Sequence, residues 1–142
     1  MVRFFNNLLT IFMAGALVLG IGGRLWMFLT GWILTGEMGF SFSGSLEVIL
    51  FGGIVGLVAG SAYLWLIKGR LKRPLFEGTY FGLGTFLFLS FLPIQGRLAF
   101  EAYERIYWFP IMLGFSILFW LYGVATVYGI SKNYVFLNFS KN

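Results

Sequence analysis

Four long runs of apolar residues constrain this chain more than any other feature of its sequence. They cover about 8–30, 46–67, 74–92 and 110–130. At ~1.5 Å per residue, the run 46–67 forms a helix of roughly 33 Å, enough to cross a hydrocarbon layer of about 30 Å. A strand of a membrane barrel would instead alternate polar and apolar residues over about ten positions. The runs therefore predict an all-α, polytopic membrane protein with four transmembrane helices.

Composition points to lipid as the solvent for most of the surface. Of the 142 residues, 59% are hydrophobic and 11% are charged, whereas a soluble domain carries roughly 25% charged residues. A globule of this size cannot hide so much apolar surface from water. We therefore expect 1–142 to form a single transmembrane domain.

The third run is the shortest. It begins at Pro74, a favourable first residue of a helix, and ends before Pro93. Its 19 residues, 74–92, would form a helix of about 28 Å. Such a helix crosses an average bilayer only if it stands nearly upright or if the bilayer becomes thinner.

Basic residues predict the orientation of the four spans. With four spans, three of the ten basic residues, Arg24, Arg97 and Arg105, would fall on one side of the membrane. The other seven lie at the N-terminus, between the second and third runs, and at the C-terminus, and they are Arg3, Lys68, Arg70, Lys72, Arg73, Lys132 and Lys141. The positive-inside rule then places both termini in the cytoplasm. The basic cluster at 68–73 suits anionic lipid headgroups better than nucleic acid, and the N-terminal run suits a retained signal anchor.

A short amphipathic helix is predicted over 97–108, on the outer side before the fourth span. Arg97, Glu101 and Arg105 would share one face, with Glu104 beside them, and apolar residues would share another. Tyr and Trp at its end suit the headgroup level. Two interpretations stay open: a docking helix for a partner, and a connector that lies on the membrane surface.

Small residues recur at four-residue spacing in three of the runs. Gly52, Gly56 and Gly60 form a double GxxxG stripe in the second run. Ala16 with Gly20, and Gly78 with Gly82, repeat the spacing in the first and third runs. In lipid, such faces let helices approach closely. We expect a bundle packed through glycine, with contact to another copy or another subunit as the alternative.

Arg24 is the charge most deeply placed in an apolar run. An unpaired Arg at mid-membrane costs at least about 2.5–3.5 kcal/mol, so we expect an ion pair with Glu47 at the outer start of the second run. A role for Arg24 in an ion pathway is the alternative. Glu77 would sit in the first turn of the third helix, where a carboxylate stabilises the helix end.

The residue inventory restricts the chemistry. The sequence has no Cys, His or Asp, which excludes disulfides, Cys/His zinc sites, His-ligated haem and Ser-His-Asp triads. We therefore expect no enzyme activity, no metal site and no resident cofactor. Bound lipid is expected, and the 21% of aromatic residues allow contact with a quinone or carotenoid.

The segment Gly22-Gly-Arg-Leu-Trp-Met27, with the glycine-rich runs and the basic Leu-Lys-Arg-Pro turn that follow, resembles small uncharacterised bacterial four-span membrane proteins that carry a Gly-Arg-x-x-Met element. The resemblance implies a bacterial cytoplasmic membrane and brings no activity with it. The sequence thus favours a non-catalytic subunit or assembly factor of a membrane complex. The alternative is a small homo-oligomeric channel or carrier with Arg24 lining the path.

Overall fold

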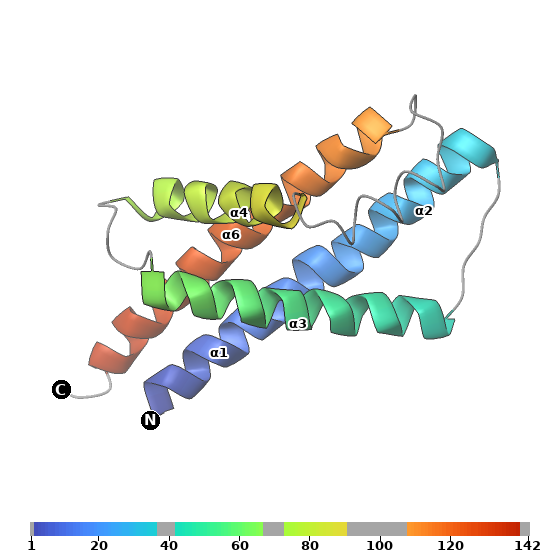
Figure 1. Cartoon of the computed structure of the whole chain (residues 1–142). Helices are drawn as coiled ribbons and strands as arrows, with labels where there is room; N and C mark the ends of the chain where they lie inside the picture. Colours follow the sequence, from blue (N-terminus) through green and yellow to red (C-terminus); the bar gives the residue numbers. More distant parts are fainter. Residues whose placement is uncertain (1, 37–41, 67–72, 91–107, 140–142) are drawn as a thin grey trace.

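The structure is a computed structural model that describes residues 2–36, 42–66, 73–90 and 108–139. Within these ranges the chain forms four helical rods (Figure 1). The first rod comprises α1 (Val2–Ala14), the π-helical segment η1 (Gly15–Ile21) and α2 (Gly22–Thr35). The other three are α3 (Phe42–Leu66), α4 (Pro74–Ser90) and α6 (Trp108–Phe139). The all-helical prediction is therefore confirmed for the part of the chain that the structure describes.

Three helical stretches are long and apolar enough to cross a membrane: Phe4–Ile33, Phe42–Leu66 and Phe109–Lys132. They correspond to the first, second and fourth predicted spans. The third predicted span corresponds to α4, whose 17 residues make it the shortest rod. A fourth crossing by α4 remains a prediction.

The first rod ends later than its apolar run predicts. We expected the first span to end near Thr30, but α2 continues to Thr35. Gly36 then adopts φ of 71° and donates its backbone N–H to the Trp32 carbonyl at 3.1 Å. A left-handed residue at this position is a common helix stop, and glycine adopts it without the Cβ clash that other residues suffer.

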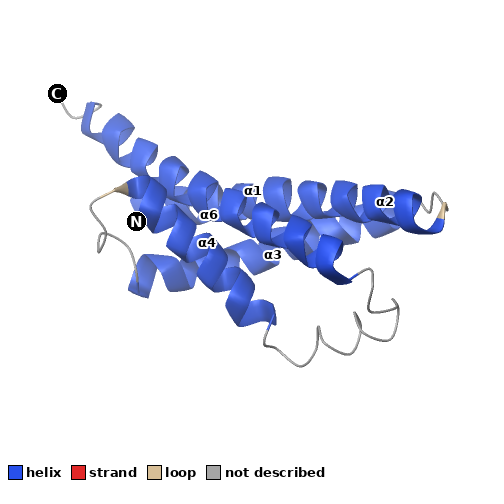
Figure 2. Ribbon diagram, turned by 90° about the horizontal axis from the view of Figure 1, so that it is seen from above, coloured by secondary structure: helices blue, strands red, loops and turns tan. Residues whose placement is uncertain are grey.

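The four rods form two pairs, and the two rods of each pair run antiparallel (Figure 1). The α1–η1–α2 rod and α6 run side by side in opposite senses, while α3 and α4 cross them obliquely (Figure 1). The same crossing is visible from above in Figure 2. The start of α1 and the end of α6 lie at one end of the bundle (Figure 1).

The first rod and α3 touch backbone to backbone. A Cβ added to Gly52 would lie 2.5 Å from the Gly20 nitrogen, and one added to Gly15 would lie 2.6 Å from the Gly52 carbonyl oxygen. Further along, a Cβ on Gly56 would lie 2.8 Å from the Gly15 Cα, and one on Gly60 would collide with the Ile11 side chain. Side chains larger than hydrogen have no room at this crossing.

The contact between α4 and α6 is equally close. A Cβ on Gly78 would lie 2.7 Å from the Val124 Cα. A Cβ on Gly82 would collide with the Phe119 carbonyl oxygen, and one on Gly123 would collide with the Gly78 carbonyl oxygen. The predicted small-residue positions of α3 and α4 therefore lie at contacts within this chain. Whether such contacts stabilise the bundle in lipid remains a prediction.

The π-helical segment places glycine at the contact between the first rod and α3. From Ile11, the ~3.6-residue period of an α-helix would bring the buried face to about residues 18 and 22. The buried residues are instead Leu19, Gly20 and Gly23, one to two positions later. One extra residue in the seven-residue η1 explains the shift. Without it, Leu19 would take the place of Gly20, where an added Cβ already lies 2.6 Å from the Ile49 Cα.

Among the described residues, few side chains are fully enclosed. The buried apolar cluster contains Ile11, Leu19, Tyr63, Phe81, Phe119, Tyr122, Val127 and Ile130. Large apolar side chains point outward on every rod, for example Val58 on α3 and Phe88 on α4, which are 70% and 68% exposed. This surface would be unfavourable in water and suits contact with hydrocarbon.

Candidate functional site

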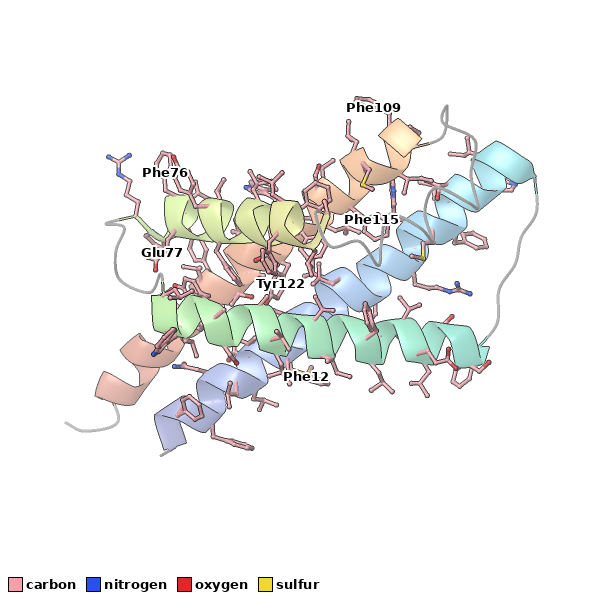
Figure 3. The ribbon with its side chains drawn as sticks, in the orientation of Figure 1. Phe12, Phe76, Glu77, Phe109, Phe115 and Tyr122 are labelled. Carbon is pink, nitrogen blue, oxygen red and sulfur yellow. The ribbon has the colours of Figure 1, made fainter. Side chains whose placement is uncertain are left out.

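A buried carboxyl–phenol pair joins α3 to α4. Glu77 is 6% exposed although it belongs to the first turn of its helix, and Tyr63 is 3% exposed. The Tyr63 hydroxyl donates a hydrogen bond of 2.9 Å to Glu77 Oε1. Figure 3 shows Glu77 pointing from α4 towards the C-terminal end of α3. The hydrogen bond ties the first turn of α4 to α3.

Aromatic rings extend this pair to α6. The ring centroids of Tyr63 and Phe81 lie 4.8 Å apart, and those of Phe81 and Tyr122 lie 5.6 Å apart, both in tilted arrangements. The Tyr122 hydroxyl donates a hydrogen bond of 2.7 Å to the Gly56 carbonyl oxygen of α3. This bond is available because Gly56 has no side chain to hold the phenol away from the backbone.

Thr126 lies one turn beyond Tyr122 on the same face of α6. Its hydroxyl is fully buried and has no hydrogen-bond partner among the described residues. Other hydroxyls on these helices bond back to their own helix, as Thr79 does to the Leu75 carbonyl at 2.8 Å. Thr126 therefore places a further hydroxyl beside Tyr122 in the interior of the bundle.

The group formed by Glu77, Tyr63, Tyr122 and Thr126 is called the polar cluster below. It contributes one carboxyl and three hydroxyls, drawn from α3, α4 and α6. Two hydrogen bonds connect its members across helices, from Tyr63 to Glu77 and from Tyr122 to the Gly56 carbonyl of α3. The arrangement can fix the relative rotation of three helices.

Arg24 lies on α2 in a half-buried position at the crossing with α3. Its Nε donates a hydrogen bond of 3.1 Å to Ser45 Oγ in the first turn of α3. Glu47, two residues further along, is exposed. The predicted Arg24–Glu47 pair stays a prediction, and the structure adds Ser45 as a partner that the sequence did not single out.

Trp26 occupies the contact between α2 and α6. A Cβ on Gly114 would collide with the indole ring, so glycine is the residue that admits Trp26 here. The indole Nε1 is buried and lacks a hydrogen-bond partner within the described ranges. On the opposite side of α6, the Trp120 indole donates to Thr79 Oγ1 at 3.0 Å and ties α6 to α4.

The remaining predicted sites divide into two groups. Ala16 is buried in η1, and Arg73 is exposed immediately before α4. The predicted outer helix lies outside the described residues, except that its last residue, Trp108, begins α6. Also outside the described ranges are Arg97, Glu101, Glu104, Arg105, Lys68, Arg70 and Lys72.

Sequence reasoning missed the polar cluster. It placed Glu77 correctly in the first turn of a helix and gave it only Arg73 as a neighbour, and it singled out neither Tyr63 nor Tyr122. A signal was available: a phenol within an apolar span needs a hydrogen-bond partner for its hydroxyl. Tyr63 also follows Gly60 by three residues and so continues the small-residue face of its helix.

The prediction on metal ions concerns the carboxylate, imidazole and thiol side chains. The described residues contain no set of three His, Cys, Asp or Glu side chains positioned to hold a metal ion. Contact with a quinone or carotenoid stays a prediction. Comparison of the chain with protein-family models, with curated proteins and with solved structures found no match.

Proposed function

We propose that this chain is an integral membrane protein that acts without catalysis, as a subunit or assembly factor of a larger complex in the bacterial cytoplasmic membrane. All four rods would cross the bilayer. Both termini would face the cytoplasm, together with the basic cluster at 68–73. Lipid and neighbouring membrane subunits would be its partners.

One observation carries this proposal: the polar and small groups are turned inward, and bulky apolar side chains are turned outward. Gly52, Gly78 and Gly82 are occupied by contacts within the chain. The buried carboxyl of Glu77 is hydrogen-bonded to a neighbouring helix. What remains on the outside is an apolar surface able to contact lipid or other membrane helices, which supports a role through helix contacts.

The alternative is a homo-oligomeric channel with Arg24 lining the path. The position of Arg24 within an apolar rod favours it, since charges at such depth are functional candidates by default. The Ser45 bond favours the subunit proposal instead, because it directs the guanidinium towards a helix of the same chain.

Purification in mild detergent from native membranes tests the proposal. We expect the tagged chain to elute with other polypeptides at a fixed stoichiometry, measured by mass spectrometry of the intact complex. Elution as a homo-oligomer alone would contradict the subunit proposal.

Liposomes that contain the purified chain test the channel alternative. Arg24→Gln would abolish ion flux if Arg24 lines a path. Arg73→Gln removes the same charge at an exposed position before α4 and serves as the matched control. Flux that depends on Arg24 and not on Arg73 would favour the channel.

A further inference from the structure

We propose that the molecule consists of two rigid halves that slide along each other, and that two tyrosine hydrogen bonds hold them in the position that the structure shows. The first half comprises the α1–η1–α2 rod and α3, and the second half comprises α4 and α6 (Figure 1). The inference goes beyond the proposed function and holds for a subunit and for a channel alike, because it concerns the chain by itself.

Within each half, glycines bring the backbone of one helix against the backbone of the other. In the first half, a Cβ on Gly15 would lie 2.6 Å from the Gly52 carbonyl oxygen. In the second half, a Cβ on Gly78 would lie 2.7 Å from the Val124 Cα. Backbone atoms cannot move aside by a change of rotamer, and close packing resists displacement. Each pair of helices is therefore held as one body.

Between the halves, glycines face side chains instead. At the contact between the first rod and α6, a Cβ added to any of four glycines would meet a side chain of the other helix. The pairs are Gly22 with Leu118, Gly23 with Phe115, Gly114 with Trp26, and Gly129 with Thr10. Side chains can change rotamer, and helices packed through them can slide along each other in small steps. The contact between the halves is therefore the adaptable one.

One of these contacts leaves a polar atom unsatisfied. The Trp26 Nε1 is buried against Gly114 and has no hydrogen-bond partner among the residues that the structure describes. A buried donor without a partner destabilises the arrangement that contains it. The observed position of the first rod on α6 thus carries a free-energy cost at Trp26, and a shift of the rod along α6 can relieve it.

Two buried hydrogen bonds join α3 to the second half. The Tyr63 hydroxyl donates to Glu77 Oε1 of α4 at 2.9 Å, and the Tyr122 hydroxyl of α6 donates to the Gly56 carbonyl oxygen at 2.7 Å. Figure 3 shows Tyr122 reaching from α6 towards α3. A relative shift of the halves by about 2 Å would break both bonds, because hydrogen bonds tolerate little lengthening. The two bonds therefore oppose the sliding that the side-chain contacts permit.

Distances between pairs of spin labels test the inference on the full chain in nanodiscs. The sequence has no cysteine, so two introduced cysteines carry the only labels. At exposed positions, Ile33 with Val58 reports on the first half, Leu87 with Tyr128 on the second half, and Val58 with Leu87 on the two halves together. We expect a narrow distance distribution within each half and a broader or double distribution between the halves. Equal widths for all three pairs would overturn the inference.

Removal of the two tyrosine hydrogen bonds provides the second comparison. Tyr63→Phe together with Tyr122→Phe keeps both rings and removes both bonds, so the mean distance between the halves should shift by about 2 Å or more. The distances within each half should stay the same. Trp120→Phe is the matched control, because the Trp120 indole donates to Thr79 within the second half, and it should leave the distance between the halves unchanged. No shift in the double variant, or an equal shift within and between the halves, would contradict the proposal.

If the double variant does not fold, the widths measured in the chain that retains both tyrosines decide alone. A chain that purifies without stoichiometric partners contradicts the proposed function and leaves the label distances unaffected. The two proposals can therefore fail separately.

Discussion

Two glycines of α4, two residues apart, should differ in how a substitution by alanine changes the free energy of unfolding. Gly82 lies against α6, where a Cβ would collide with the Phe119 carbonyl oxygen and lie 3.0 Å from the Trp120 Cα. Gly84 has no atom within 4 Å of a Cβ added to it. Changing each to alanine adds one methyl group to the same helix, once at a backbone contact and once in open space.

The magnitude follows from two terms. Alanine is more favourable than glycine in a helix interior by ~1 kcal/mol, and this gain is common to both variants. Overpacking costs about 1–3 kcal/mol at a close contact, and the neighbours of Gly82 are backbone atoms that cannot rotate away. We therefore expect Gly84→Ala to leave the free energy of unfolding unchanged or raise it by up to ~1 kcal/mol. The free energy of unfolding of Gly82→Ala should be lower than that of Gly84→Ala by about 1–3 kcal/mol.

Unfolding by sodium dodecyl sulfate in mild mixed micelles measures this difference. Circular dichroism and tryptophan fluorescence should report the same transition, since Trp120 lies beside the altered contact. Gly84→Ala is the internal control for helix propensity and expression. If the two variants agree to within ~0.5 kcal/mol, the close approach of α4 and α6 does not stabilise the fold and the reasoning is wrong.

Two further perturbations test other contacts. Tyr122→Phe removes the hydrogen bond to the Gly56 carbonyl and should lower the free energy of unfolding by roughly 0.6–1.7 kcal/mol. Tyr128→Phe, at an exposed position, is the control and should leave the free energy of unfolding unchanged. Equal effects of the two substitutions would show that the Tyr122 bond does not stabilise the fold. Deletion of Leu17 from η1 converts the π turn into an α turn and preserves both buried faces, so the variant should fold. Deletion of Ile117 from α6 turns the preceding segment by about 100° and should prevent folding. Yields of monodisperse protein in detergent compare the two deletions, and equal yields would contradict our account of the π segment.

Hydropathy predicted the helical class and the approximate positions of the rods because both depend on the local run of side chains. The helix ends were less accurate. We expected the second span to begin near Leu46, and α3 begins at Phe42, because Ser and Gly in its first turn lower the hydropathy without interrupting the helix. The π segment had no local signal, since it exists to align residues on either side of it with α3.

Arg24 shows why the site was harder to predict than the fold. Its position in an apolar run indicated that a polar partner was needed, and the sequence offered Glu47 as the nearest acid. The structure shows a hydrogen bond from Arg24 to the hydroxyl of Ser45, a residue that the sequence did not single out, and the pair with Glu47 stays a prediction. Ser45 and Glu47 are about 200° apart around α3, on nearly opposite faces, so the rotation of the helix decides which of them faces Arg24, and the sequence does not give that rotation.

The sequence by itself determined that the chain forms long apolar helices with few internal charges, because length and hydropathy belong to each segment alone. Only the tertiary structure decided that Glu77 meets Tyr63, that Tyr122 reaches Gly56, and which glycines touch. Those contacts depend on how far each helix is rotated and at what height it crosses its neighbour. Both quantities are set by segments distant in the chain that exclude one another's volume.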